Sequence, residues 1–361
     1  MNLMRKLHQS PILLGLMFGI LLAVVMTYEN QSSTLFVRSF ADASSNAAPS
    51  VVNIYTTTFS QEPLNAEDNR HSFFSRRQQR LQRKRELSLG SGVILHEQGF
   101  IITNVHVIDG ADEILVLLYD GRSALASVVG KDKATDLAIL KIDLPELKAI
   151  AVGESDSMRV GDAVLAIGNP YGFGQSVSAG IISAKGRYGL NINAYESFIQ
   201  TDAAINKGSS GGALVDEKGL LIGINSAIYS QQGGSVGIGL AIPIEIAAKV
   251  LKDIITHGHV IRGWLGLDVT QLNPINAAKL GISESSGIVI THVIANGPAE
   301  KIGLKAGDVI ISIHNEKISN GQDGLLRVAN LEPGQIIDIE ILRDHKQLSF
   351  TPMLGKRPAN R

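Results

Sequence analysis

The sequence contains no cysteine, and this absence removes several kinds of chemistry. Without thiols the chain cannot form disulfides, use a cysteine nucleophile, or bind zinc or an iron–sulfur cluster through cysteine. An excess of charge of one sign is missing as well, because 33 lysines and arginines stand against 34 aspartates and glutamates. This balance argues against a chain built mainly to coat nucleic acid. Few aromatic residues (5%) and 37 glycines favour many tight turns over long helical bundles.

No cofactor or metal is expected. The chain has no phosphate-binding G-x-G-x-x-G segment after a predicted strand. His257 and His259 are two lone histidines on a predicted linker, which make a poor metal site. A hydrophobic content of 44% is typical of globular proteins, and 361 residues are enough for two folded domains and a tail or anchor.

A single long hydrophobic run stands near the N-terminus. Residues Pro11–Tyr28 are uncharged and approach the roughly 20 residues that span a bilayer. Arg5 and Lys6 precede the run, so the positive-inside rule keeps the first residues in the cytoplasm and exports the rest. We predict a transmembrane signal anchor over residues 1–30 and a tether over 31–50. A cleaved signal peptide and a buried core helix remain the alternatives.

Short β-type runs follow the tether, separated by Gly, Asn and Asp turns, with no substantial helix between them. This pattern predicts an all-β barrel or sandwich within a domain over residues 51–258. The predicted strands are Val51–Thr58, Ser91–Leu95, Phe100–Thr103, Glu113–Leu118, Ala124–Val129, Leu137–Ile142, Ala163–Ile167, Ala213–Val215, Leu220–Asn225 and Val236–Ile242.

The predicted β domain ends in a helix. After Pro243, apolar residues recur on one helical face, and Gly258 closes the segment. The residues of that face are Ala247, Val250, Leu251, Ile254 and Ile255. Residues 259–355 then have room for one small α/β domain.

A basic insertion over residues 60–88 interrupts the strand pattern. Within it seven basic residues lie beside Phe73 and Phe74, namely Arg70, Arg76, Arg77, Arg80, Arg83, Lys84 and Arg85. A solvated insertion between two strands, a regulatory loop and a contact with anionic lipid are all consistent with this composition. Nucleic-acid binding would need an aromatic or groove-reading fold around it, and none is evident.

The strongest chemical signal is Gly-Ser-Ser-Gly-Gly at residues 208–212. Glycines let the backbone turn sharply around a serine, so that neighbouring N–H groups can face a developing oxyanion. Ser210 then needs an oriented base. His106 follows an apolar strand of the same β domain, and Asp136 opens another. The order His, Asp, Ser is that of chymotrypsin.

Each of these residues also has a structural interpretation: a turn aspartate, a structural histidine and a flexible glycine loop. Their order within one β domain favours the catalytic interpretation. The segments TNVHV, TDLAIL, GSSGGALV and AIGNPYGFGQSVSAGIISAKGR resemble the HtrA family of serine proteases over about residues 45–355. One anchor, one protease domain and one PDZ domain resemble its membrane-anchored envelope-stress type. The resemblance implies a chymotrypsin-like double β-barrel, a small α/β PDZ domain and a homotrimer of protease domains.

The resemblance assigns roles to individual residues. It implies that Ser210 is the nucleophile, His106 the general base and Asp136 the group that orients the base. The backbone N–H groups of Gly208 and Ser210 would form the oxyanion hole.

Two positions depart from the family pattern. The family most often has Asn where this chain has Ser209, and often Pro where it has Lys207. Because the oxyanion donors are backbone groups, both changes should be tolerated, although they leave the conformation of this loop open. The resemblance also implies a substrate pocket of Ile205, Leu221 and Ala227, which would accept a small aliphatic side chain.

The C-terminal segments Arg262–Leu267, Gly297–Ala299 and Gly303–Ile310 resemble the PDZ domains of HtrA proteases. By that resemblance, backbone N–H groups of the loop bind the carboxylate of a peptide that adds a strand to the sheet edge. The loop residues are Trp264, Leu265, Gly266 and Leu267. A helix near Gly324–Leu331 would form the other wall of the groove. Core packing is the alternative for Trp264, the only tryptophan.

The resemblance further implies regulation. Tyr171 and Arg187 match its activation and sensor loops, although Arg187 would equally suit an ordinary surface turn. C-terminal peptides of misfolded outer-membrane proteins would bind the PDZ domain, and the activated protease would make the first cut in a membrane-bound anti-sigma factor. The chain would then be anchored in the inner membrane with both domains in the periplasm. A general quality-control protease or chaperone and a non-catalytic PDZ scaffold are the competing hypotheses.

Overall fold

The computed structural model describes residues 15, 18–23, 39–62, 82–228, 234–272, 275, 277–278, 287–318 and 320–358. Contacts divide the chain into two units, Met1–Asp42 and Ala43–Arg361. Most of the predicted membrane span Pro11–Tyr28 lies outside the described residues, and the described ones there are helical. Within the described part of the chain, no helix has the length and apolar character needed to cross a membrane.

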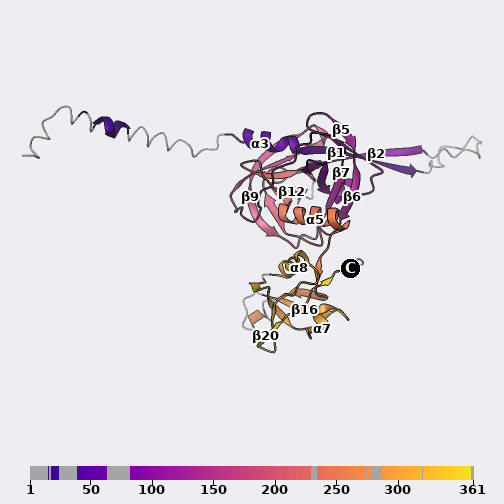
Figure 1. Ribbon diagram of the computed structural model, residues 1–361, viewed down its shortest axis with the longest axis vertical. Helices are drawn as coiled ribbons and strands as arrows, with labels where there is room; N and C mark the ends of the chain where they lie inside the picture. Colours follow the sequence, from indigo (N-terminus) through magenta and orange to yellow (C-terminus); the bar gives the residue numbers. More distant parts are fainter. Residues whose placement is uncertain are drawn as a thin grey trace, which may run out of the picture. The chain divides into compact units, whose positions relative to one another are not determined.

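A seven-stranded antiparallel sheet forms the first half of the predicted β domain (Figure 1). Its strands follow the order β5-β4-β1-β2-β3-β7-β6. They are β1 (Val51–Glu62), β2 (Gln82–His96), β3 (Phe100–Asn104), β4 (Glu113–Leu117), β5 (Ser123–Leu125), β6 (Ser127–Asp132) and β7 (Leu137–Lys141). Strand β4 alternates exposed and buried side chains, whereas β7 is buried almost throughout, although each lies one strand from an edge of the sheet. The single predicted strand Ala124–Val129 is two strands, β5 and β6.

The second sheet closes into a barrel in the order β10-β13-β12-β11-β8-β9. Its strands are β8 (Ala163–Gly168), β9 (Ser176–Arg187), β10 (Phe198–Thr201), β11 (Ala213–Asp216), β12 (Leu221–Ile228) and β13 (Gly239–Pro243). The sequence pattern did not predict β9 and β10. In β9, Val177 and Ile181 are exposed, and Gly180 sits where a Cβ would meet the backbone of Ala203 at 2.3 Å. The strand therefore lacks a regular buried face in its sequence.

Helix α5 (Ile244–His257) confirms the predicted helix. Gly258 ends it in the left-handed conformation (φ 75°), and its N–H donates to the Ile254 carbonyl at 2.9 Å. The helix packs closely on β6, because a Cβ at Gly130 would meet Ile254 at 2.7 Å. Glycine at this position allows the helix to lie directly against the first sheet.

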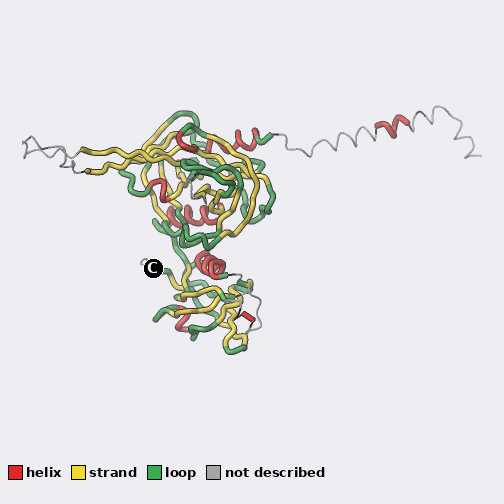
Figure 2. The backbone as a smooth tube through the Cα atoms, turned by 180° about the vertical axis from the view of Figure 1, so that it is seen from behind, coloured by secondary structure: helices red, strands yellow, loops and turns green. Residues whose placement is uncertain are grey.

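Strands β1 and β2 extend beyond the sheet as a two-stranded ribbon (Figure 2). Their register continues to the pair Glu62 and Gln82. The ends of the predicted insertion 60–88 are therefore strands. Residues 63–81, with most of the basic cluster, lie outside the described part of the chain.

The C-terminal residues form a small α/β domain, as predicted. Its elements are β14 (Gly263–Trp264), β15 (Leu267–Gln271), β16 (Ile288–Val293), α7 (Pro298–Lys301), β17 (Val309–Ile313), β18 (Glu316–Lys317), α8 (Gly321–Asn330), β19 (Ile339–Arg343), β20 (Lys346–Phe350) and β21 (Gly355–Lys356). Asn320 caps α8, its side-chain oxygen accepting from the Asp323 N–H at 2.9 Å. A core that includes Ile290, Ile339 and Ile341 lies under the sheet.

The C-terminal domain contains an ion pair whose carboxylate is buried. Asp308 is 1% exposed and accepts two hydrogen bonds from the Arg343 guanidinium, at 2.6 and 2.7 Å. These hydrogen bonds raise the pKa of Arg343 above its usual range. We expect Arg343→Gln to lower the free energy of unfolding of this domain by about 3–5 kcal/mol, because the Asp308 charge stays buried without its partner.

The fluorescence of Trp264, the only tryptophan, reports on this domain during urea unfolding. The matched control is Glu316→Gln in the same domain, which breaks the exposed pair with Arg327 and should cost less than about 1 kcal/mol. An equal decrease in the free energy of unfolding for the two variants would contradict the prediction.

Candidate active site

The structure brings His106 and Asp136 together at one end of the first sheet. His106 lies on the short helix α4 (Val105–Ile108), which directly follows β3. Its Nδ1 is 2.6 Å from Asp136 Oδ2, and its backbone N–H donates to Asp136 Oδ1 at 3.0 Å. The carboxylate therefore fixes both the ring and the turn of helix that carries it. A neutral ring with its proton on Nδ1 leaves Nε2 free to accept a proton.

Asp136 has an unusual backbone conformation with φ 60°, which side-chain-bearing residues seldom adopt. Four hydrogen bonds hold it there. Besides the two to His106, its carbonyl accepts from Asn104 Nδ2 at 3.0 Å and from the Val105 N–H at 3.1 Å. Strained residues of this kind are found at functional sites, where the surrounding contacts over-determine them.

Ser210 comes from the second sheet, in the turn before β11. Its Oγ donates to the Ser226 carbonyl on β12 at 3.0 Å. Among the described residues, no hydrogen bond joins this hydroxyl to His106. Proton transfer between them therefore requires the hydroxyl to exchange Ser226 for the imidazole. Its backbone carbonyl is fixed, since it accepts from the Ser91 N–H at 2.8 Å.

The backbone around Ser210 offers two N–H donors. Those of Gly208 and Ser210 make no hydrogen bond within the part of the chain that the structure describes. The carbonyl preceding the first donor, that of Lys207, accepts from the Tyr171 N–H at 2.9 Å. Carbonyl and N–H of one peptide plane point in opposite directions, so this bond directs the Gly208 N–H away from Tyr171. The Ser91 hydroxyl holds the next carbonyl, that of Gly208, at 2.7 Å.

The space and the backbone conformation at residue 208 require a glycine. It has φ 99°, and a Cβ there would meet the Asn169 carbonyl oxygen at 2.4 Å. We expect Gly208→Ala to lower kcat by about 10²–10³-fold, because the new Cβ would force the Gly208 N–H away from its position and so remove one oxyanion donor. Gly161 has the same φ of 99° and open space around it, so Gly161→Ala is the matched control. Steady-state cleavage of a disordered protein by both variants tests this, and equal activity in the two would contradict it.

The other predicted residues lie as follows. Ile205 and Leu221 are fully buried, and Ile205 packs on Gly239 of β13. Ala227 pairs with Leu240 through the backbone, and its side chain is outside the described part. Their pocket role stays a prediction. Arg187, at the end of β9, donates to Gln200 Oε1 at 2.8 Å.

A groove of 370 Å³ runs along the C-terminal domain. The predicted loop residues Trp264, Leu265, Gly266 and Leu267 all line it. The predicted helix is α8, and it supplies the facing wall. The N–H groups of Leu265 and Gly266 make no hydrogen bond among the described residues. Two N–H donors on a loop that lines a groove with many apolar residues suit a peptide carboxylate.

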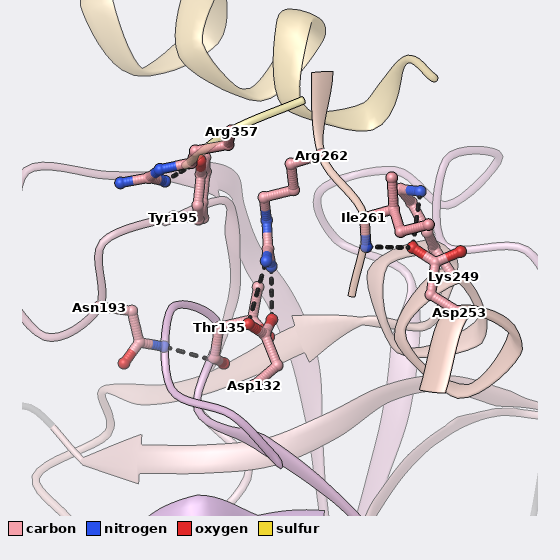
Figure 3. Close-up of polar contacts among 9 residues, drawn as sticks. All are labelled: Asp132, Thr135, Asn193, Tyr195, Lys249, Asp253, Ile261, Arg262 and Arg357. Atoms are coloured by element: carbon pink, nitrogen blue, oxygen red, sulfur yellow. Dashed lines mark hydrogen bonds and ion pairs between the residues drawn. The ribbon is translucent and has the colours of Figure 1, made fainter. Parts of the chain in front are cut away.

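Two residues that sequence reasoning missed line the same groove. Tyr195 comes from the loop between β9 and β10, and Arg357 follows β21 (Figure 3). The Arg357 guanidinium donates to the Tyr195 hydroxyl and lies 5.2 Å from the ring centroid. Arg262 lies on the same ring at 4.6 Å and forms an ion pair with Asp132 of β6. The residues of each pair are more than 60 positions apart in sequence, so no local sequence motif could predict these contacts.

Among the described residues, no group of three or more His, Asp or Glu side chains is arranged to hold a metal ion.

Comparisons with known proteins agree with this geometry. A trypsin-like peptidase domain matches residues 90–224, and a PDZ domain matches residues 263–352. The serine endoprotease DegS of Escherichia coli (strain K12) is 39% identical over an aligned length of 368, and the match covers 98% of this chain and 99% of DegS. The periplasmic serine endoprotease DegP of the same organism is 44% identical over 281 residues, 77% of this chain and 59% of DegP.

A solved structure of the HtrA-type protease AlgW with a decapeptide superposes with a TM-score of 0.74 at 50% identity. The match covers 89% of this chain and 99% of the AlgW chain. A protease with a PDZ domain is what the sequence patterns predicted, and the end-to-end match with DegS supports the same arrangement. The chain is a serine endopeptidase and belongs to the HtrA-type proteases with one trypsin-like domain and one PDZ domain.

Proposed function

We propose that this endopeptidase works in a bacterial envelope and is activated by C-terminal peptides that bind its PDZ groove. The observation that carries the proposal is the groove itself. Its loop presents two N–H groups with no partner among the described residues, and Tyr195 of the protease domain forms part of its wall. A ligand in this groove therefore contacts both domains at once.

In the proposed reaction, Ser210 Oγ attacks the carbonyl carbon of the scissile peptide bond. His106 Nε2 takes the hydroxyl proton and later gives it to the leaving amine. Asp136 holds the ring through Nδ1 and stabilises the imidazolium that forms. The N–H groups of Gly208 and Ser210 stabilise the negative oxygen of the tetrahedral intermediate. In the second half, His106 takes a proton from a water molecule whose oxygen attacks the acyl carbon, and it then gives that proton to the departing Ser210 Oγ.

The activating step rests on contacts between the groove and the triad. The Tyr195 N–H donates to the Ala134 carbonyl at 3.0 Å, and Asn193 of the same loop donates to the Thr135 carbonyl at 3.2 Å. Ala134 and Thr135 are the two residues before Asp136. A peptide shifts the protein towards its active arrangement only by the difference in its affinity for the two arrangements. A bound peptide that contacts Tyr195 can therefore bind the two arrangements with different affinity.

The finer assignments follow the family. We propose that the peptides are the exposed C-termini of misfolded outer-membrane proteins and that the substrate is a membrane-bound anti-sigma factor. Tyr171 and Arg187 belong to the loops that carry the signal. The chain is proposed to act as a homotrimer, anchored in the inner membrane with its catalytic domains in the periplasm. The 99% coverage of DegS supports this type of protease.

The test is cleavage of a disordered protein by the full-length chain in nonionic detergent. One sample receives a peptide with an aromatic C-terminal residue and a free carboxylate, and the other the same peptide with an amidated C-terminus. We expect a many-fold rise in kcat/KM with the free carboxylate and none with the amide, because the amide cannot accept as an anion from the loop N–H groups. Full activity without peptide would contradict the proposal. It would favour the second candidate, a general quality-control protease, which the 44% identity to DegP supports.

A further inference from the structure

A second cavity, of 730 Å³, lies where the protease domain, the linker and the C-terminal residues meet. Its lining includes Lys133, His259, Arg262, Lys356 and Arg357. None of the described residues that line it carries a carboxylate. In a chain with almost equal numbers of acidic and basic residues, such a one-sided lining is a local concentration of charge.

Most of this positive charge is not compensated. Of these cations, only Arg262 has a carboxylate partner among the described residues, namely Asp132, to which it donates from both terminal nitrogens. Lys133, Lys356 and Arg357 form no ion pair within the described part of the chain. Three cations that share one cavity repel each other, and an anion between them would relieve this repulsion.

Two of the three cations are held in place. Arg357 donates to the Tyr195 hydroxyl and stacks on its ring. Lys356 Nζ lies 3.1 Å from His259 Nε2, and His259 Nδ1 lies 3.0 Å from the His257 carbonyl. The ring therefore accepts from the ammonium and donates to the carbonyl. Because these side chains are already ordered, a ligand loses less free energy in fixing them.

We propose that this cavity is a binding site for a phosphorylated anion that carries several negative charges. A single carboxylate would balance one of the three free cations, whereas a ligand with two or more phosphoryl groups balances all of them. The guanidinium of Arg357 matches the oxygens of a phosphoryl group, and the lysines act as point charges. The bound anion links Lys133 of the protease domain to Lys356 and Arg357 beyond the PDZ sheet.

Two probes distinguish the source of the phosphoryl groups. Tripolyphosphate represents a free phosphate, and fluorescently labelled phosphatidic acid in nonionic detergent micelles represents a lipid headgroup. Binding to the full-length chain is measured by calorimetry for the first and by fluorescence anisotropy for the second. The test variant is Lys133→Gln with Lys356→Gln, which leaves Arg357 and the peptide groove intact. Its control is Lys148→Gln with Lys218→Gln, which removes the same charge from exposed sites elsewhere.

We expect at least one probe to bind, with affinity that falls as salt rises. The test variant should weaken this binding at least about tenfold, the effect of losing two charged contacts, and the control variant should leave it unchanged. Binding of tripolyphosphate alone would identify a free phosphate as the ligand, and binding of the lipid alone a headgroup. If neither probe binds, or if both variants weaken binding equally, the cavity is not an anion site.

Discussion

Ser210→Ala should lower kcat for peptide-bond hydrolysis by about 10⁴–10⁶-fold, the range expected on loss of a serine nucleophile. Without the hydroxyl no acyl-enzyme can form, and only the contribution of the oxyanion hole and substrate binding is left. The fold should be retained, since the Ser91 N–H bonds the backbone carbonyl of residue 210 and not its side chain. Cleavage of a disordered protein measures the loss.

Ser209→Ala is the matched control, because it removes a hydroxyl one residue away and leaves both oxyanion donors in place. It should keep most of the activity. Labelling with a fluorophosphonate gives an independent readout, since this reagent reacts with activated serines: the Ser209 variant should be labelled and the Ser210 variant should not. Labelling of both would show that another serine is the nucleophile.

Asp136→Asn should lower kcat by about 10⁴-fold, as expected when the orienting carboxylate of a triad is neutralised. The amide no longer stabilises the imidazolium. If its NH₂ group faces His106, it also reverses the tautomer and places the ring proton on Nε2, where the base must accept. Asparagine tolerates the left-handed backbone at this position, so the turn should survive.

Asp120→Asn controls for the loss of a carboxylate. Asp120 is exposed, and hydrogen bonds from Arg122 lower its pKa. Its replacement should leave kcat unchanged. The Asp136 variant should also regain activity as pH rises, because hydroxide can assist where the oriented base is missing. Unchanged activity at neutral pH would exclude Asp136 from the triad.

The sequence was most informative where function depends on local motifs. The glycines around Ser210 and the short apolar strands before His106 and after Asp136 predicted three residues that lie more than 100 positions apart at their extremes. The structure brings His106 and Asp136 into contact. The strand pattern likewise predicted most of both sheets, since alternation and burial are local properties of a strand.

The remaining features depend on distant contacts that no local pattern encodes. The Ser210 hydroxyl pairs with Ser226, and the wall of the peptide groove includes Tyr195 from another domain. Strand β9 was missed because two of its apolar residues, Val177 and Ile181, are exposed. Its Gly180 lies too close to the backbone of Ala203 for a side chain. The predicted anchor and most of the basic insertion fall outside the described residues and stay predictions.

The division of the triad between two sheets has a consequence for the newly made chain. His106 and Asp136 belong to the first sheet, which is complete at β7, whereas the barrel that carries Ser210 closes only when β13 pairs with β10. Domains fold as units, and N-terminal ones begin first during synthesis. A nascent chain thus holds a base without a nucleophile until about residue 243 has emerged. The triad is therefore assembled only after the barrel closes, so a half-made protease domain cannot yet cleave other proteins.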